Sequence, residues 1–200
     1  MSGRSVSQRA AAIFAAALLF AACTFCAQAA DPAELKKKAE ICAACHGAEG
    51  NSTNPVVPSL AGQPEQFLTT QLVMFREGNR KDPQMSPMAA NLSNSDINDL
   101  GSYFSARAMA APQHKTDPKN VEAGKLLAER NHCVSCHAPT LKGQQHIPRL
   151  AGQQYQYLRA QLLGFKASTR FDMDGNMTSA AQALSPQDIE IIADFLAGLQ

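Results

Sequence analysis

The stretch Cys42-Ala43-Ala44-Cys45-His46 recurs 91 residues later as Cys133-Val134-Ser135-Cys136-His137. The flanking sequence repeats with nearly the same offset, because Pro58-Ser59-Leu60-Ala61-Gly62-Gln63 returns as Pro148-Arg149-Leu150-Ala151-Gly152-Gln153. Self-similarity at a fixed period over a whole unit indicates a tandem duplication. Each unit spans roughly 80–90 residues, which is small but enough to fold around a large cofactor.

The first 30 residues have the composition of a secretory signal peptide. Two arginines precede an apolar run over residues 10–22, and Ala27-Gln28-Ala29 has the small-x-small form of a cleavage site. The apolar run is too short to span a bilayer. An uncleaved anchor and a lipoprotein attached through Cys23 are therefore the less favoured alternatives. We expect cleavage after residue 29 or 30 and export to the periplasm.

Composition narrows the class of protein further. Hydrophobic residues make up 45% of the chain and charged residues 18%, a balance typical of globular proteins. Without residues 1–30 the chain has 16 Lys and Arg against 17 Asp and Glu, so it has no broad basic face for nucleic acid. The polar, proline-bearing stretch 111–118 is typical of a linker. We therefore expect one domain over 31–111 and another over 112–200.

Helical patterns dominate both units, and no segment alternates with the period of a strand. Asp31-Pro32 and Asp117-Pro118 each predict the start of a helix that runs to its CxxCH motif. A further helix is expected near Pro64, with a counterpart that carries Tyr157 and Leu158. Ser93 and Ser185 each stand three residues before an Asp, which predicts a capped last helix in each unit. Gly101 and Ala193 occupy matched positions on those last helices, where a small residue lets another helix cross closely.

The chemistry of the chain lies in the two CxxCH motifs. Two cysteines at this spacing can add across the vinyl groups of one haem, and the adjacent histidine then becomes the proximal ligand of the iron. A zinc ribbon would place its two CxxC pairs closer together, and a thioredoxin-type dithiol expects a βαβ context that is missing here. The motifs thus predict two covalently bound haem c groups, held by Cys42, Cys45 and His46 and by Cys133, Cys136 and His137.

The second axial ligand of each iron is sought among the methionines. Met85 lies seven residues before Leu92, and Met177 lies seven residues before Leu184. Because a ligand that both units need should be present in both, we choose Met85 and Met177, each expected in a loop before the last helix. Met88 and Met173 have no twin in the other repeat. They remain alternatives, since a methionine a few residues away can take the place of another in a mobile loop.

Other repeated or polar residues have two interpretations each. Pro58 and Pro148 follow the histidines at similar distances, so their carbonyl groups are candidate acceptors for the second ring nitrogen of each histidine, or they are simple turn prolines. Arg80 and Arg170 either meet haem propionates or are solvated. Three histidines without twins are expected at the surface: His114, His132 and His146.

The duplicated CxxCH, PxLAGQ and Met-before-LSxxDI pattern resembles the cytochrome c4 family over essentially the whole chain after residue 30. The resemblance implies an all-α fold of two tandem class I cytochrome c domains, each wrapped around one covalently attached haem. It implies His/Met ligation by His46 with Met85 and by His137 with Met177. Family members are periplasmic, soluble or loosely membrane-associated, and pass electrons from respiratory donors to haem–copper terminal oxidases. The stretch 172–176 departs from the first unit, which leaves the choice between Met173 and Met177 open.

These features lead us to expect an electron carrier that is not an enzyme. The alternatives are the cytochrome subunit of a flavin-containing dehydrogenase complex and, less favoured, a dihaem peroxidase. A peroxidase needs one haem with an open sixth position, whereas both units offer a methionine.

Overall fold

Regular structure in residues 31–200, the part of the chain that the computed structural model describes, is helical. The described residues hold one isolated bridge, between Gln144 and Ile147, and no strand. The all-α fold class is therefore confirmed. The signal peptide expected over 1–30, with Cys23 and the cleavage site, lies outside the described residues.

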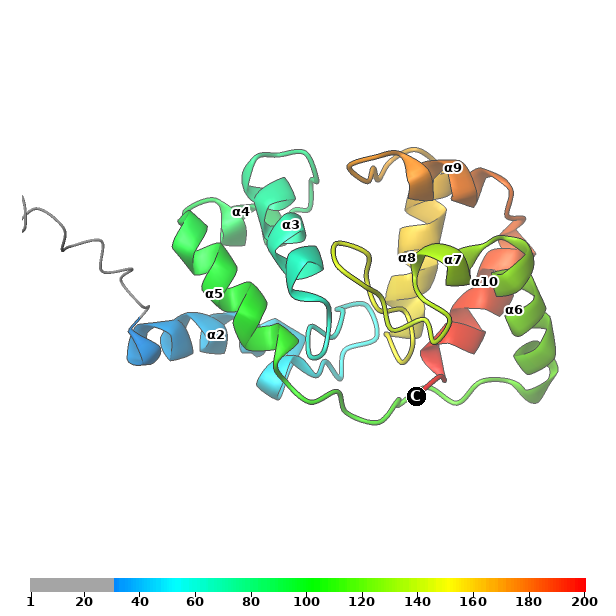
Figure 1. Cartoon of the computed structure of the whole chain (residues 1–200), viewed down its shortest axis with the longest axis horizontal. Coiled ribbons are helices and arrows are strands. Elements are labelled where there is room, and N and C mark those ends of the chain that lie inside the picture. Colours follow the sequence, from blue (N-terminus) through cyan, green and yellow to red (C-terminus); the bar gives the residue numbers. More distant parts are fainter. Residues whose placement is uncertain (1–30) are drawn as a thin grey trace, which may run out of the picture. The chain divides into compact units, whose positions relative to one another are not determined.

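The helices form two successive sets that follow the sequence repeat (Figure 1). The first set consists of α2 (Pro32–His46), the short 3₁₀ helix η1 (Ala48–Gly50), α3 (Glu65–Arg76), α4 (Met85–Ala89) and α5 (Asn94–Ser105). The second consists of α6 (Pro118–Arg130), α7 (Cys133–Cys136), α8 (Tyr155–Lys166), α9 (Asn176–Gln182) and α10 (Pro186–Ala197). The main helix contacts lie within a set: α5 packs on α2 and α3, and α10 packs on α6 and α8.

The expected helix starts are confirmed by their caps. The side chains of Asp31 and Asp117 accept hydrogen bonds from the first turns of α2 and α6, and each helix has Pro at its first position. Ser93 and Ser185 form complete capping boxes at the starts of α5 and α10. The apolar residues of these last helices then form the cores, with Leu100 and Ile192 almost fully buried.

Two expectations about secondary structure are wrong. Helix α2 runs through His46, but its counterpart stops at Arg130, because the Asn131 side chain donates to the Leu127 carbonyl and His132 takes a left-handed φ of 56°. A separate short helix then carries the second CxxC pair. Met85 and Met177 do not lie in loops, since they occupy the first turns of α4 and α9.

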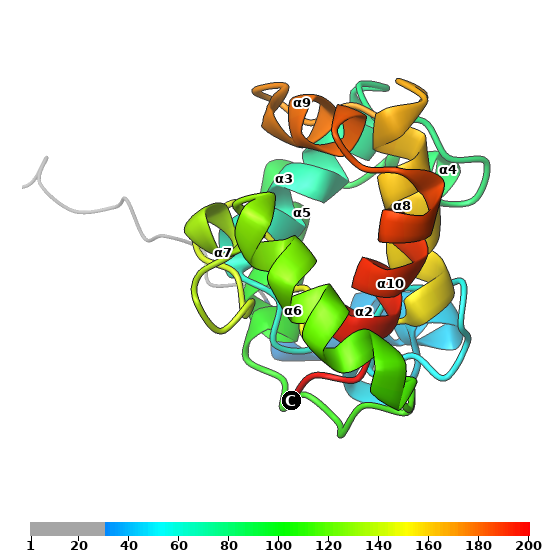
Figure 2. The same cartoon turned by 90° about the vertical axis from the view of Figure 1, so that its right-hand side faces the viewer.

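Glycines allow the closest helix crossings. At Gly101 of α5, a Cβ would lie 2.5 Å from Thr69 Cγ2 of α3, so the crossing expected at this position is confirmed. In the second set the close approach uses α6 instead: a Cβ at Gly124 would lie 2.7 Å from Phe195 Cγ of α10. Figure 2 shows α6 beside α10. Each of these glycines thus lets its helix lie close to a neighbouring helix of the same set.

We expect Gly124→Ala to lower the free energy of unfolding by ~1–2 kcal/mol, because overpacking outweighs the gain in helix propensity. Urea unfolding of the haem-loaded protein measures the change. Lys125→Ala, on the exposed side of the same helix, is the matched control and should stay within ~0.5 kcal/mol of the parent. Equal stabilities of the two variants would contradict the close crossing of α6 and α10.

Candidate functional site

The histidine of each CxxCH motif is buried and held by one proline carbonyl. His46 Nδ1 lies 2.8 Å from the Pro58 carbonyl oxygen, and His137 Nδ1 lies 2.8 Å from that of Pro148. Of the two interpretations of these prolines, the acceptor role is confirmed. A histidine that binds a metal through one ring nitrogen is commonly oriented in this way by an acceptor for the other.

This contact shows which nitrogen of each ring carries a proton. A carbonyl oxygen only accepts, so Nδ1 is protonated, and in the neutral ring Nε2 then keeps its lone pair. Within residues 31–200 no hydrogen bond uses Nε2 of either histidine. Burial lowers the pKa of His46 and of His137, and the bond to the proline carbonyl offsets this only in part. Each ring is therefore a neutral imidazole with a free Nε2, the form that ligates a metal.

The PxLAGQ segment holds the proline carbonyl beside Nδ1 of the histidine ring. In the first repeat the Leu60 and Ala61 amides donate to the Gly50 carbonyl, and in the second Leu150 and Ala151 donate to that of Leu141. The glycine of the motif then donates to the last helix: Gly62 to Phe104 and Gly152 to Leu196. The segment is thereby attached both to the turn after the histidine and to the last helix of its own repeat.

The four cysteines within residues 31–200 are free thiols in matched environments. Cys42 and Cys133 are partly buried, and burial raises the pKa of each, while Cys45 and Cys136 are exposed. No group of three or more His, Cys, Asp or Glu side chains in residues 31–200 is arranged to hold a metal ion by side chains alone. Two thiols next to a neutral histidine with a free Nε2 fit a covalently bound haem c in each repeat.

Aspartates that the sequence did not single out hold both candidate methionine segments. Asp82 Oδ1 accepts from the Met85 amide at 2.8 Å. Asp172 Oδ2 accepts from the Met177 amide at 2.9 Å, and its other oxygen accepts from Thr178. The rival Met88 and Met173 are 50% and 73% exposed, respectively.

The two repeats meet through a reciprocal pair of buried glutamines. Ser59 N donates to Gln153 Oε1 at 2.8 Å, and Gln153 Nε2 donates back to the Ser59 carbonyl at 2.9 Å. In the same way Arg149 N donates to Gln63 Oε1 at 2.9 Å, and Gln63 Nε2 donates to the Arg149 carbonyl at 3.0 Å. The sequence shows this glutamine as a repeated residue, but its contact with the opposite repeat was not predicted from it. The PxLAGQ repeat was the signal, since a motif kept in both units must serve both.

One buried cation breaks the symmetry of this junction. Arg149 stands where the first repeat has Ser59, is 3% exposed, and donates to the carbonyls of Ala151 and, across the junction, Ala61. Its Nε has no partner within the described residues. Burial lowers the pKa of Arg149 to about 10, so the guanidinium stays charged at neutral pH.

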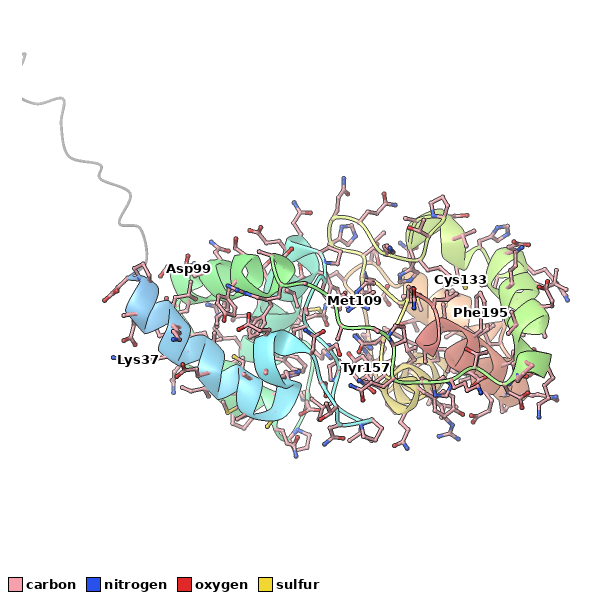
Figure 3. All side chains as sticks on the ribbon, turned by 90° about the horizontal axis from the view of Figure 1, so that it is seen from below. Lys37, Asp99, Met109, Cys133, Tyr157 and Phe195 are labelled. Carbon is pink, nitrogen blue, oxygen red and sulfur yellow. The ribbon has the colours of Figure 1, made fainter. Side chains whose placement is uncertain are left out.

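Two further arginines, Arg80 and Arg170, lie where the repeats meet near α3 and α8. Arg80 donates to Gln71 of its own repeat and to the Tyr157 hydroxyl and Gln161 across the junction. Figure 3 labels Tyr157 there. Burial would raise the pKa of Tyr157, but the positive charges of Arg80 and Arg170 outweigh it and lower that pKa. Arg80 and Arg170 are partly buried, and each lies over a phenylalanine ring and donates to a neighbouring glutamine. The choice between solvation and contact with haem propionates stays a prediction.

Of the three histidines expected at the surface, His132 and His146 are exposed. His114 is not, because the linker lies against the second repeat: its Nε2 is 2.6 Å from Asp194 Oδ1, and its ring stacks on Tyr155. None of the helices in the described part of the chain is long and apolar enough to cross a membrane.

We expect Gly143→Ala to disturb the support of His137. Gly143 has φ +75°, and a Cβ there would lie 2.5 Å from Arg149 N, on the peptide whose carbonyl accepts from the histidine. The free energy of unfolding should fall by ~3 kcal/mol or more, from backbone strain plus overlap. Gly175→Ala is the matched control, since Gly175 has φ +73° but open space, and should lose only the strain of ~1–2 kcal/mol. Equal losses would mean that the peptide does not pack on Gly143.

Known proteins are similar to this chain in sequence and in fold. The family model described as cytochrome c matches residues 35–106 and again 121–200. Cytochrome c4 of Pseudomonas aeruginosa is 36% identical over 183 residues, which cover 86% of this chain and 90% of that protein. The crystal structure of reduced recombinant cytochrome c4 from Pseudomonas stutzeri superposes with a TM-score of 0.78 at 32% identity and covers 86% of this chain and 100% of that one.

A relative that is named for a different role is almost as similar. A thiosulfate dehydrogenase electron acceptor of Thiomonas intermedia is 35% identical over 188 residues, which cover 86% of this chain and 85% of that protein. The fold expected from the duplicated motifs, two tandem cytochrome c domains, is thereby confirmed. With two matched segments and full-length relatives of the same architecture, this chain belongs to the cytochrome c4 family of the cytochromes c.

Proposed function

We propose that this chain is an exported electron carrier that holds two haem c groups and passes single electrons between protein partners. The observation that carries the proposal is the repeated pair of neutral, buried histidines, each with Nδ1 held at 2.8 Å by a proline carbonyl and with Nε2 free. Membership of the cytochrome c4 family supports an electron-transfer role.

The proposal assigns the same roles in both repeats. One haem is attached by Cys42 and Cys45 in a domain over 31–111, and the other by Cys133 and Cys136 in a domain over 112–200. The axial ligands are His46 with Met85 and His137 with Met177. The exposure of Met88 and Met173 and the aspartate bonds at Met85 and Met177 support this choice.

The chain's own residues make the site suitable for electron transfer and not for binding substrate. A haem c supplies a one-electron Fe(III)/Fe(II) couple when bound. The histidine is locked in one orientation by its carbonyl, and the methionine segment is fixed by its aspartate. With the histidine and the methionine of each repeat holding the iron, the site would change little when the electron arrives, and it would leave no position for peroxide. We therefore propose a carrier and not an enzyme.

The proposal also covers the cellular location of the protein and its redox partners. The residues before Asp31 have the pattern of a periplasmic export signal. The partners would be redox proteins, a respiratory donor complex and a haem–copper terminal oxidase, as the family resemblance implies. The first repeat has 9 acidic against 7 basic residues and the second 8 against 9, which supports different partners at the two repeats.

The ligand assignment predicts the behaviour of single methionine variants. Met85→Ala and Met177→Ala should each remove half of the Met-to-Fe(III) charge-transfer absorption and lower one of the two midpoint potentials, because a thioether ligand favours Fe(II). Met88→Ala and Met173→Ala are the matched controls and should leave both unchanged. Loss of the band in Met173→Ala would instead put the second ligand at Met173.

A second candidate function is that of the dedicated acceptor of a dehydrogenase complex. Its support is the similarity to the thiosulfate dehydrogenase electron acceptor of Thiomonas intermedia. The flavin-containing dehydrogenase complex, which the sequence left as an alternative, is one form of this function. Stopped-flow measurements of the rate at which a purified thiosulfate dehydrogenase and a flavin dehydrogenase each reduce this protein distinguish the two kinds of dehydrogenase partner. Reduction by neither, together with rapid oxidation by a haem–copper oxidase, would favour the free carrier.

A further inference from the structure

Each histidine is connected to the opposite repeat through a single peptide group. The Pro58 carbonyl that accepts from His46 belongs to the same peptide as the Ser59 N–H, which donates to Gln153 Oε1 at 2.8 Å. The Pro148 carbonyl that accepts from His137 shares its peptide with the Arg149 N–H, which donates to Gln63 Oε1 at 2.9 Å. Two hydrogen-bond chains therefore cross the junction in opposite directions.

The orientation of each glutamine amide in these chains is fixed by its partners. A backbone N–H can pair only with Oε1, and a backbone carbonyl can pair only with Nε2. Both glutamines satisfy both groups, and they are only 2% and 3% exposed, so water does not replace the contacts. The Oε1 atom of each glutamine therefore faces the peptide that supports the histidine of the opposite repeat.

We propose that Gln153 and Gln63 are positioning residues that tune the haem of the opposite repeat: Gln153 acts on the site of His46, and Gln63 acts on the site of His137. This inference rests on the proposed function, since it concerns the proximal ligands of the two haem groups. It makes the junction part of both redox sites and not only a contact between domains.

The direction of the effect follows from polarisation. An acceptor on a peptide N–H makes the carbonyl of that peptide a stronger acceptor in turn. A stronger acceptor at Nδ1 makes the imidazole a more basic ligand through Nε2, which stabilises Fe(III) relative to Fe(II). Each glutamine therefore lowers the reduction potential of the opposite site, and its removal raises that potential.

The test is a spectroelectrochemical titration of the mature, haem-loaded protein. Gln153→Met keeps the length of the side chain and removes the amide, and it should raise the potential of the His46 site while that of the His137 site stays fixed. Gln63→Met should do the converse. We expect a change of about threefold in the equilibrium constant between the two haems, which is ~28 mV at 59 mV per tenfold for one electron. Repeating the titrations in Met177→His, which moves its own wave, assigns each wave to a repeat.

Gln154→Met is the matched control. Gln154 Nε2 also crosses the junction, to the Ser52 carbonyl at 2.6 Å, but it does not touch either histidine-supporting peptide. Its loss should move neither potential. If Gln153→Met does not load haem, Gln153→Glu still tests the chain, because its carboxylate is a stronger acceptor and should lower the potential of the His46 site.

The inference is overturned if Gln153→Met shifts the site of its own repeat, if Gln154→Met gives the same shift, or if neither glutamine variant moves a potential. A parent protein that lacks the Met-to-Fe(III) band at either haem would overturn the proposed function instead. A parent with both bands and no crosswise shift would overturn the inference alone.

Discussion

The hydrogen bond from each histidine Nδ1 to a proline carbonyl is the contact on which the rest of the structure depends. It sets the tautomer, leaves Nε2 free for the iron that we propose it binds, and helps to orient the ring. The PxLAGQ segment, the turn after the histidine and the last helix all act to place that carbonyl. The same peptide then faces the other repeat, so the group that supports each proposed metal site also contacts the opposite repeat.

The junction buries positive charge without a carboxylate partner among the described residues. Arg149 bonds only to carbonyl groups, and Arg80 and Arg170 converge on Tyr157 and Gln161. Burying a cation is costly unless it is compensated. The cofactors proposed for this protein carry propionate groups, and the unpartnered Nε atoms of Arg149 and Arg170 are donors suited to such anions. Only the second repeat contributes Arg149, so the duplicated sites are electrostatically unequal.

Sequence alone predicted the features that local rules decide. The capping boxes at Ser93 and Ser185, the all-α class and the proline carbonyls were read from pattern, because each depends on neighbours in the chain. The break at His132 was missed, since a single side-chain cap at Asn131 outweighs helix propensity there. The crossed pairs of Gln63 and Gln153 were missed because they depend on how the repeats pack, which no periodicity encodes. The ligand roles of Met85 and Met177 remain predictions.

Amide hydrogen exchange of the reduced, haem-loaded protein tests most directly whether the peptides at Ser59 and Arg149 join the two repeats. Both amides are buried donors to glutamine oxygens, so they should exchange only through the large openings that also expose α3 and α8. The contradicting result is that these two amides exchange as fast as those of the linker around His114 while α3 and α8 stay protected. The crossed hydrogen bonds between the repeats would then be absent in the haem-loaded protein.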